Sequence, residues 1–253
     1  MIDLRADQNL EKLHSLYVYS YADFIYRCVQ GANGFDDDEI FVDYLSEPLK
    51  VVKPQKVTLL HEFIANVTRF EVTYLVDKFP EDSVESTKEI LREANIPAPK
   101  WLKSTRMRER LDEVCELLEE AVATFTPSIF FVLFSDRQFL TLFQGRIAAF
   151  VGTLTTDNHP ALIMRNGVLK RPNNLPVWLK AAIFHRDRGR CQHCWKDMTG
   201  LGRPITDLHL DHIVPLAASG SNDPTNFQLA CERCNKRKGA REINQPSKFT
   251  PYW

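Results

Sequence analysis

Four of the six cysteines fall in two pairs, Cys191-Gln-His-Cys194 and Cys231-Glu-Arg-Cys234, with 36 residues between them. Each pair predicts a tight turn that presents two sulfurs, and four thiolates in this arrangement suit tetrahedral zinc. Because sulfur takes all four positions, we expect a structural zinc that contributes folding energy. The first residues do not resemble a secretory leader, which disfavours disulfides, and the alternative is a cluster of buried thiols. His193, between two of the cysteines, is expected at the surface.

Between the two cysteine pairs, Asp211 and His212 stand next to each other in a short segment of alternating character. An aspartate offers a hard oxygen ligand suited to magnesium. A histidine with a pKa near neutrality can take a proton from water. Asn235 supplies a second oxygen ligand further on, and the next three residues are basic where a phosphate backbone can approach: Lys236, Arg237 and Lys238. Taken one at a time, these side chains also fit a loop cap, a partly buried histidine and a solvated helix face.

The combination of motifs is more specific than any one of them. The strings LDHIVP, NFQLAC and CERCNKRKG follow one another, with a glycine-containing loop after the first. This arrangement resembles the HNH, or ββα-metal, endonuclease family, in the variant whose fold is bracketed by a four-cysteine zinc site. The lead-in FHRDRGRC is also similar to that family, and the resemblance covers about residues 176–241.

The resemblance implies roles for individual residues. It makes His212 the general base and Asp211 a ligand of a catalytic Mg²⁺ or Mn²⁺. It maps the second metal ligand to Asn235 and the asparagine that shapes the histidine-bearing loop to Asn226. The implied chemistry is a one-metal phosphodiester hydrolysis that leaves 5′-phosphate and 3′-hydroxyl ends. The residues implied to hold the nucleic-acid backbone are Lys238, Arg237 and Lys236.

The elements that must position these residues lie in the last third of the chain. A helix over 177–186, a strand over 208–214, a second strand over 226–229 and a helix after Cys231 are expected. Residues 176–245 are therefore predicted to be an HNH nuclease domain with structural zinc, followed by a C-terminal tail over 246–253.

The sequence predicts that most of the rest of the chain is helical. Amphipathic patterns predict helices over 8–29, 54–78 and 105–125, and Thr126-Pro127 is expected to open a further helix towards Val151. Residues 1–155 are predicted to form an acidic helical domain that regulates, targets or binds a partner. Residues 156–175, rich in Pro, Gly and Asn, are a predicted connector with a small hairpin at Asn166-Gly167. The fold class is thus a mainly α N-terminal domain plus a small α+β C-terminal ββα-metal domain.

The net charge of −1 conceals a division of charge along the chain. Residues 1–169 hold 18 Lys+Arg against 26 Asp+Glu, whereas residues 170–253 hold 14 against 7. This asymmetry indicates a polyanion partner for the basic part, although segregated surface charge alone would give the same pattern. The longest apolar run is six residues, which predicts no membrane span, and we expect a cytoplasmic location.

The leading hypothesis is a metal-dependent endonuclease acting on DNA, with RNA as the other candidate substrate. Restraint or targeting of the nuclease by the N-terminal domain is a further hypothesis, as is a place in bacterial restriction or phage defence. The first alternative is a non-catalytic, zinc-stabilised nucleic-acid binding module, which would not need Asp211, His212 and Asn235 together. A second alternative is an adaptor that binds a protein partner through the helical domain. The sequence leaves open the oligomeric state and the choice between nicking and double-strand cleavage.

Overall fold

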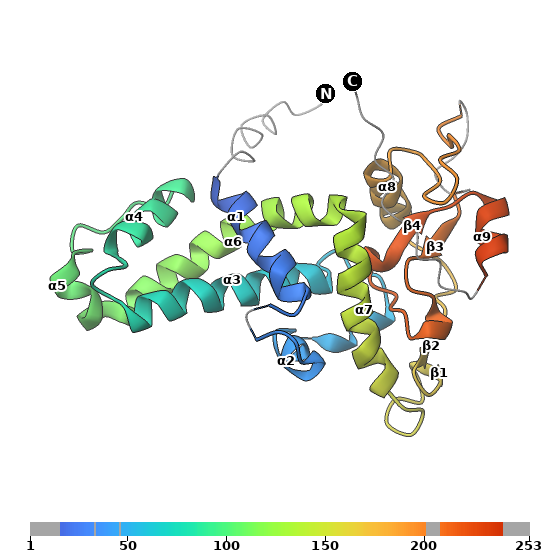
Figure 1. Ribbon diagram of the computed structural model, residues 1–253, viewed down its shortest axis with the longest axis horizontal. Coiled ribbons are helices and arrows are strands. Elements are labelled where there is room, and N and C mark those ends of the chain that lie inside the picture. Colours follow the sequence, from blue (N-terminus) through green and yellow to red (C-terminus); the bar gives the residue numbers. More distant parts are fainter. Residues whose placement is uncertain (1–15, 33, 46, 201–207, 240–253) are drawn as a thin grey trace. The chain divides into compact units, whose positions relative to one another are not determined.

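The computed structural model describes residues 16–32, 34–45, 47–200 and 208–239 (Figure 1). The predicted tail over 246–253 and the first half of the predicted helix over 8–29 lie outside these residues. The chain folds as two compact units, one made of residues 1–27 and 61–132 and the other of residues 28–60 and 133–253. These units differ from the predicted boundary at the connector, so the domain assignment made from the sequence stays a prediction.

The first unit is built from helices. It contains most of α1 (Leu16–Val29), α3 (Leu59–Lys78) and α6 (Leu111–Ser135), together with α4 (Val84–Glu93), α5 (Ser104–Met107) and a short 3₁₀ helix (Arg108–Arg110). Val114, Leu118 and Phe125 are buried on one face of α6. The stretch Arg108–Ser135 is long and apolar enough to cross a membrane, but core helices meet the same criterion. The burial of one face and the acidic residues on the other are typical of a core helix.

Two predicted helix boundaries are wrong. The helix predicted over 54–78 begins only at Leu59, so Pro54 is not in its first turn. The sequence predicts that a helix begins at Thr126-Pro127, but α6 continues through Pro127 to Ser135. The Thr126 hydroxyl donates to the Val122 carbonyl oxygen at 2.8 Å, and Ile129 is buried in the next turn. Packing on both sides of Pro127 therefore offsets the backbone hydrogen bond that proline cannot make. The break comes at Asp136, whose carboxylate accepts from the Phe139 N–H at 3.0 Å and caps the next helix.

The second unit holds the sheets and the cysteine pairs. Its elements are α2 (Asp38–Asp43), a 3₁₀ helix (Pro48–Val52), α7 (Arg137–Thr153), β1 (Ile163–Arg165), β2 (Val168–Leu169), α8 (Val177–Arg186), β3 (Leu210–His212), 3₁₀ helices (Leu216–Ala218 and Pro224–Asn226), β4 (Phe227–Leu229) and α9 (Glu232–Lys238). The structure confirms the predicted order of helix, strand, loop, strand and helix. It also confirms the hairpin at Asn166-Gly167, where β1 pairs antiparallel with β2 and Gly167 takes a φ of +71°.

Strands β3 and β4 pair antiparallel, with Asp211 opposite Gln228 and His212 opposite Phe227. Helix α8 packs on β4 over a core that includes Leu179, Ile183 and Phe227. The polar residues at the end of α8 fix this packing. Arg186 donates to the Phe227 carbonyl oxygen at 2.6 Å, and Asp187 accepts from the Leu229 N–H at 2.6 Å.

The fold class predicted from the sequence is confirmed: the chain is mainly helical, with two small antiparallel sheets towards its C-terminal end. The second unit is nevertheless larger than a ββα module, because it includes residues 28–60 and α7. Charge is divided between the units as well. The first contains 12 Lys+Arg against 18 Asp+Glu, and the second contains 20 against 15.

Candidate functional site

The four paired cysteines come together as the sequence predicts. Their sulfurs all lie within 4.8 Å of one another, and those of Cys194 and Cys231 are 3.8 Å apart. Zinc–sulfur bonds of about 2.3 Å in a tetrahedron place sulfurs about 3.8 Å apart, so the cluster has the dimensions of a zinc site. With four sulfur ligands such a site is closed and structural.

Local backbone geometry presents these sulfurs. The Trp195 N–H donates to the Cys191 carbonyl oxygen at 2.8 Å, and Trp195 is left-handed with a φ of +62°. Cys231 precedes the first turn of α9, which carries Cys234. Burial alone would raise the pKa of Cys231, but the Cys234 N–H and the neighbouring sulfurs lower it to about 7. Burial and the neighbouring sulfurs instead raise the pKa of Cys234, so the four thiols do not ionise alike. A bound metal would hold all four as thiolates, because the thiolate is the ligand.

The carboxylate of Asp211 is buried and surrounded by donors. Lys238 Nζ lies 3.0 Å from Oδ1 and 2.9 Å from Oδ2, and Gln228 Nε2 donates to Oδ2 at 2.8 Å. His193 Nε2 lies 3.0 Å from the same Oδ2. Burial alone would raise the pKa of Asp211, but His193 and Lys238 lower it. Asp211 is therefore held as a carboxylate.

His193 corrects an expectation from the sequence. It was expected at the surface, yet it is 6% exposed and its ring faces Asp211. The turn between Cys191 and Cys194 points its side chain inward, next to Gln228. The cysteine cluster is thus joined to Asp211 by one imidazole ring.

Lys238 also differs from its expected role. The resemblance implies a lysine that holds a nucleic-acid backbone, but this side chain is 1% exposed. Besides its contacts with Asp211, it donates to the carbonyl oxygen of His212. Its ammonium group is occupied inside the unit because it compensates the buried carboxylate. Lys236 and Arg237 are exposed on the same helix, and Lys236 pairs with Glu232 at 2.6 Å.

His212 ends β3 beside Asp211 and is 7% exposed. Its Nε2 lies 3.1 Å from Asn222 Oδ1, and its ring packs against Phe227 with centroids 4.5 Å apart. Burial lowers the pKa of His212 to about 4, and the nearby Arg171 guanidinium acts in the same direction. The ring is therefore neutral at pH 7, which is the form that accepts a proton.

Asn226 shapes the loop that follows His212. Its side chain is fully buried and accepts from the Val214 N–H at 2.8 Å. The same amide donates to the carbonyl oxygens of Val214 at 3.0 Å and Ser221 at 2.8 Å. Gly220 is needed nearby, because a Cβ there would lie 1.9 Å from the Val214 carbonyl oxygen. The loop is thus closed by one amide side chain and one glycine.

Residues far away in sequence support this loop. Gln144 of α7 accepts from the Ser221 hydroxyl and donates to the Thr225 hydroxyl, both at 2.7 Å. Asp223 accepts from the Leu59 N–H at 3.0 Å, at the start of α3. Asn222, which contacts His212, donates to the carbonyl oxygens of Val52 and Lys170, both at 3.0 Å.

Sequence analysis did not identify these supporting residues. The string Asn222-Asp223-Pro224 carries only a loop signal, and Gln144 lies in an apolar helix with no motif around it. Their roles depend on contacts across as many as 170 positions of the chain.

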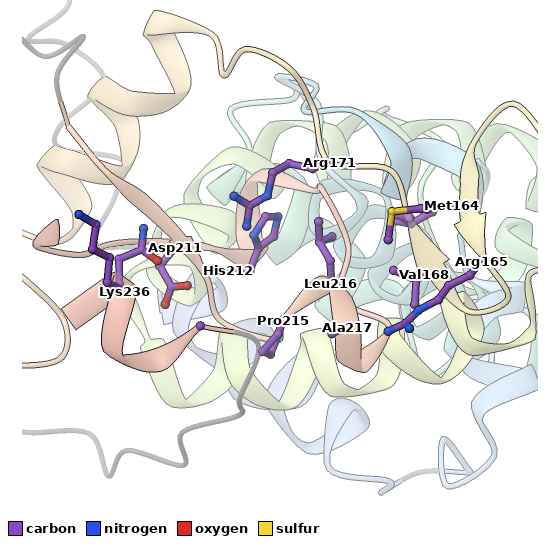
Figure 2. Close-up of a pocket in the computed structure, with 13 residues that line it drawn as sticks. Met164, Arg165, Val168, Arg171, Asp211, His212, Pro215, Leu216, Ala217 and Lys236 are labelled. Carbon is purple, nitrogen blue, oxygen red and sulfur yellow. The ribbon is translucent and has the colours of Figure 1, made fainter. Parts of the chain in front are cut away.

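A cavity of about 510 Å³ brings four of the residues predicted from the sequence together, whereas Arg237 does not line it (Figure 2). It is lined by Asp211, His212, Asn235 and Lys236, and by Gly239 at the end of α9. The opposite wall comes from the β1–β2 hairpin and the segment after it. Asn226 and Lys238 do not line this cavity, since both side chains are used inside the unit.

Comparison with protein families supports this picture for one part of the chain. Residues 191–241 match the sequence model of the HNH endonuclease family. Comparisons with curated proteins and with solved structures gave no match.

Proposed function

We propose that this chain is a metal-dependent HNH endonuclease that hydrolyses phosphodiester bonds in DNA. The observation that carries the proposal is that Asp211, His212 and Asn235 line one cavity. It brings an ionised carboxylate, a neutral imidazole and an amide oxygen within reach of one substrate. The family match over 191–241 is in keeping with a nucleic-acid substrate.

The donor set fits a hard divalent cation. Asp211 Oδ1 accepts one hydrogen bond, from Lys238 at 3.0 Å, and a carboxylate oxygen has a second lone pair for a metal. Asn235 supplies a neutral oxygen from α9 on the same cavity. Asp211 and Asn235 would hold Mg²⁺ or Mn²⁺, which would stabilise negative charge on the scissile phosphate and its leaving oxygen.

The residues of the chain have separate tasks in this proposal. His212 accepts the proton of the attacking water, and Asn222 holds its ring. Asn226 maintains the loop that follows His212. The products carry 5′-phosphate and 3′-hydroxyl ends, which a ligase rejoins.

A supercoiled-plasmid assay tests the proposal. The purified chain is compared with and without added Mg²⁺ or Mn²⁺, and the His212→Ala variant is compared with His209→Ala. His209 is exposed two positions before Asp211 and does not line the cavity, so its variant is the matched control. We expect metal-dependent nicking that is lost only in His212→Ala. Equal activity of the two variants would exclude His212 as the base.

A non-catalytic nucleic-acid binding module remains the second candidate. The contacts around Asp211 favour it, because Lys238 compensates the charge of this carboxylate without any metal. A chain that retards DNA in a gel but leaves plasmid intact at every metal concentration would select this function over the nuclease.

Two wider roles belong to the proposal. Restraint or targeting by the helical residues 1–155 is supported by the acidic balance of the first unit. Reversing exposed acidic residues of α6, as in Glu116→Lys with Glu120→Lys, should raise the nicking rate if this charge restrains the enzyme.

A role in phage defence rests on analogy with the family. Phage plating efficiency on cells expressing the chain or its His212→Ala variant tests it.

A further inference from the structure

The cavity beside His212 has a wall that the sequence suggested was only a connector. The hairpin β1–β2 contributes Met164, Arg165 and Val168, and Arg171 follows two positions after β2. None of these residues falls within the family match over 191–241. The cavity therefore combines residues of the family match with a segment that lies outside it.

The hairpin is fixed in place rather than loosely attached. Gly167 at its turn donates its N–H to the Leu154 carbonyl oxygen at 2.9 Å. Lys170 Nζ donates to the carbonyl oxygens of Pro160 and Ala161, both at 3.0 Å. The carbonyl oxygen of Lys170 accepts from Asn222, the residue that also contacts His212. The Asn222 side chain thus links the backbone next to Arg171 to the imidazole ring of His212.

Arg165 and Arg171 are the cations best placed to meet a ligand. Both are exposed, and neither has an ion-pair partner within the described part of the chain. Figure 2 shows the guanidinium of Arg171 beside the ring of His212, with Arg165 at the other end of the cavity beyond Leu216. On α9, Lys238 and Lys236 are less available to a ligand, because Lys238 is buried and Lys236 is paired with Glu232.

We propose that Arg171 and Arg165 bind backbone phosphates of one strand, Arg171 next to the bond to be cleaved and Arg165 farther along the cavity, so that the hairpin aligns the nucleic-acid strand over His212. A guanidinium group matches a phosphate with two parallel hydrogen bonds and stays charged at any relevant pH. Leu216, which lines the cavity between the two arginines, can contact a sugar or base. This inference rests on the proposed function and names the residues that position its substrate.

Binding measurements on a His212→Ala background test the inference without cleavage. Arg171→Ala, Arg165→Ala and the double variant are compared with Lys56→Ala, which removes an exposed cation of the same unit that does not line the cavity. Each arginine variant should bind a short DNA duplex about tenfold more weakly, the loss of one charged hydrogen-bonding contact. The slope of log K against log salt concentration should fall by about 0.9 for each arginine removed. Lys56→Ala should bind like its parent.

Two further measurements exclude indirect effects. Thermal unfolding midpoints should stay unchanged, because neither arginine side chain makes a hydrogen bond within the described residues. Arg171→Lys keeps the charge but loses the paired hydrogen bonds, so its affinity should lie between those of the parent and Arg171→Ala.

The outcomes separate this inference from the proposed function. A chain that cleaves DNA while the double variant binds with parental affinity and salt slope overturns the role of the hairpin alone. A chain that binds without cleaving, and binds more weakly in both arginine variants, supports the hairpin and overturns the nuclease. A chain that binds neither DNA nor RNA overturns both.

Discussion

The two ends of the β3–β4 hairpin are held by different chemistry. At the zinc end, four sulfurs converge within 4.8 Å, and His193 carries the contact to Asp211. At the loop end, buried hydrogen bonds converge on residues 219–226, and Asn222 carries the contact to His212. One end supports the proposed metal ligand and the other supports the proposed base.

This difference shows which parts of the site are self-contained. At the zinc end the four sulfurs and His193 all come from residues 191–234, within the family match, although α8 packs against them. The loop end depends on Gln144 of α7 and on the backbone near Val52 (Figure 1). A fragment that begins near residue 170 would therefore keep all the motifs and lose the support of the loop.

The largest loss of stability should come from removing one cysteine of the four-cysteine cluster at the zinc end. Cys234→Ser removes a buried sulfur, and because metal binding contributes folding energy, we expect loss of zinc and a cost of several kcal/mol. Zinc content by mass spectrometry and the thermal unfolding midpoint measure this. Cys115→Ser, outside the cluster, is the matched control and should keep one zinc per chain. Full zinc content in Cys234→Ser would contradict a four-cysteine site.

A smaller loss should follow from weakening the loop end. Gln144→Leu keeps the volume of the side chain but removes one hydrogen bond from each of the Ser221 and Thr225 hydroxyls, which keep only their contacts with Asp223. This loss should cost about 2 kcal/mol. Gln138→Leu, at an exposed position of the same helix, is the control and should change stability little. Faster amide hydrogen exchange in residues 219–226 of Gln144→Leu alone is the expected signature. Unchanged exchange there would mean that α7 does not support the loop.

The contrast between the ends also explains what the sequence could predict. The four-cysteine cluster and the order of strand, loop, strand and helix depend on local patterns, and the structure confirms both. The inward side chain of His193 depends on the path of a turn that spacing alone does not determine. The partnership of Gln144 with Ser221 spans 77 positions, so it exists only once the fold has formed.

Removing one link at each end should have different effects on catalysis. His193→Ala removes one of the three contacts that hold Asp211 Oδ2, so we expect a Mg²⁺ requirement raised about tenfold and recovered at high metal concentration. Asn222→Ala releases the ring of His212, so its nicking rate should fall and not recover with added Mg²⁺. Magnesium titrations of the plasmid assay separate these patterns, with Asn173→Ala at an exposed position as control. The same magnesium response in both variants would refute separate roles for the two ends.

The smallest expected effect concerns acid stability at the loop end. Burial lowers the pKa of His212 to about 4 from the value of 6.5 expected when the chain is unfolded. Between these values the unfolded chain binds a proton that the folded chain does not, so stability falls as the pH falls. From pH 7 to pH 5.5 this group should cost about 1 kcal/mol. Acid also protonates the cysteine thiolates, but that loss is common to wild type and His212→Leu and cancels when urea unfolding of both is compared at each pH. His212→Leu should therefore lose less stability than wild type, and parallel losses would show that His212 does not titrate as a buried neutral ring.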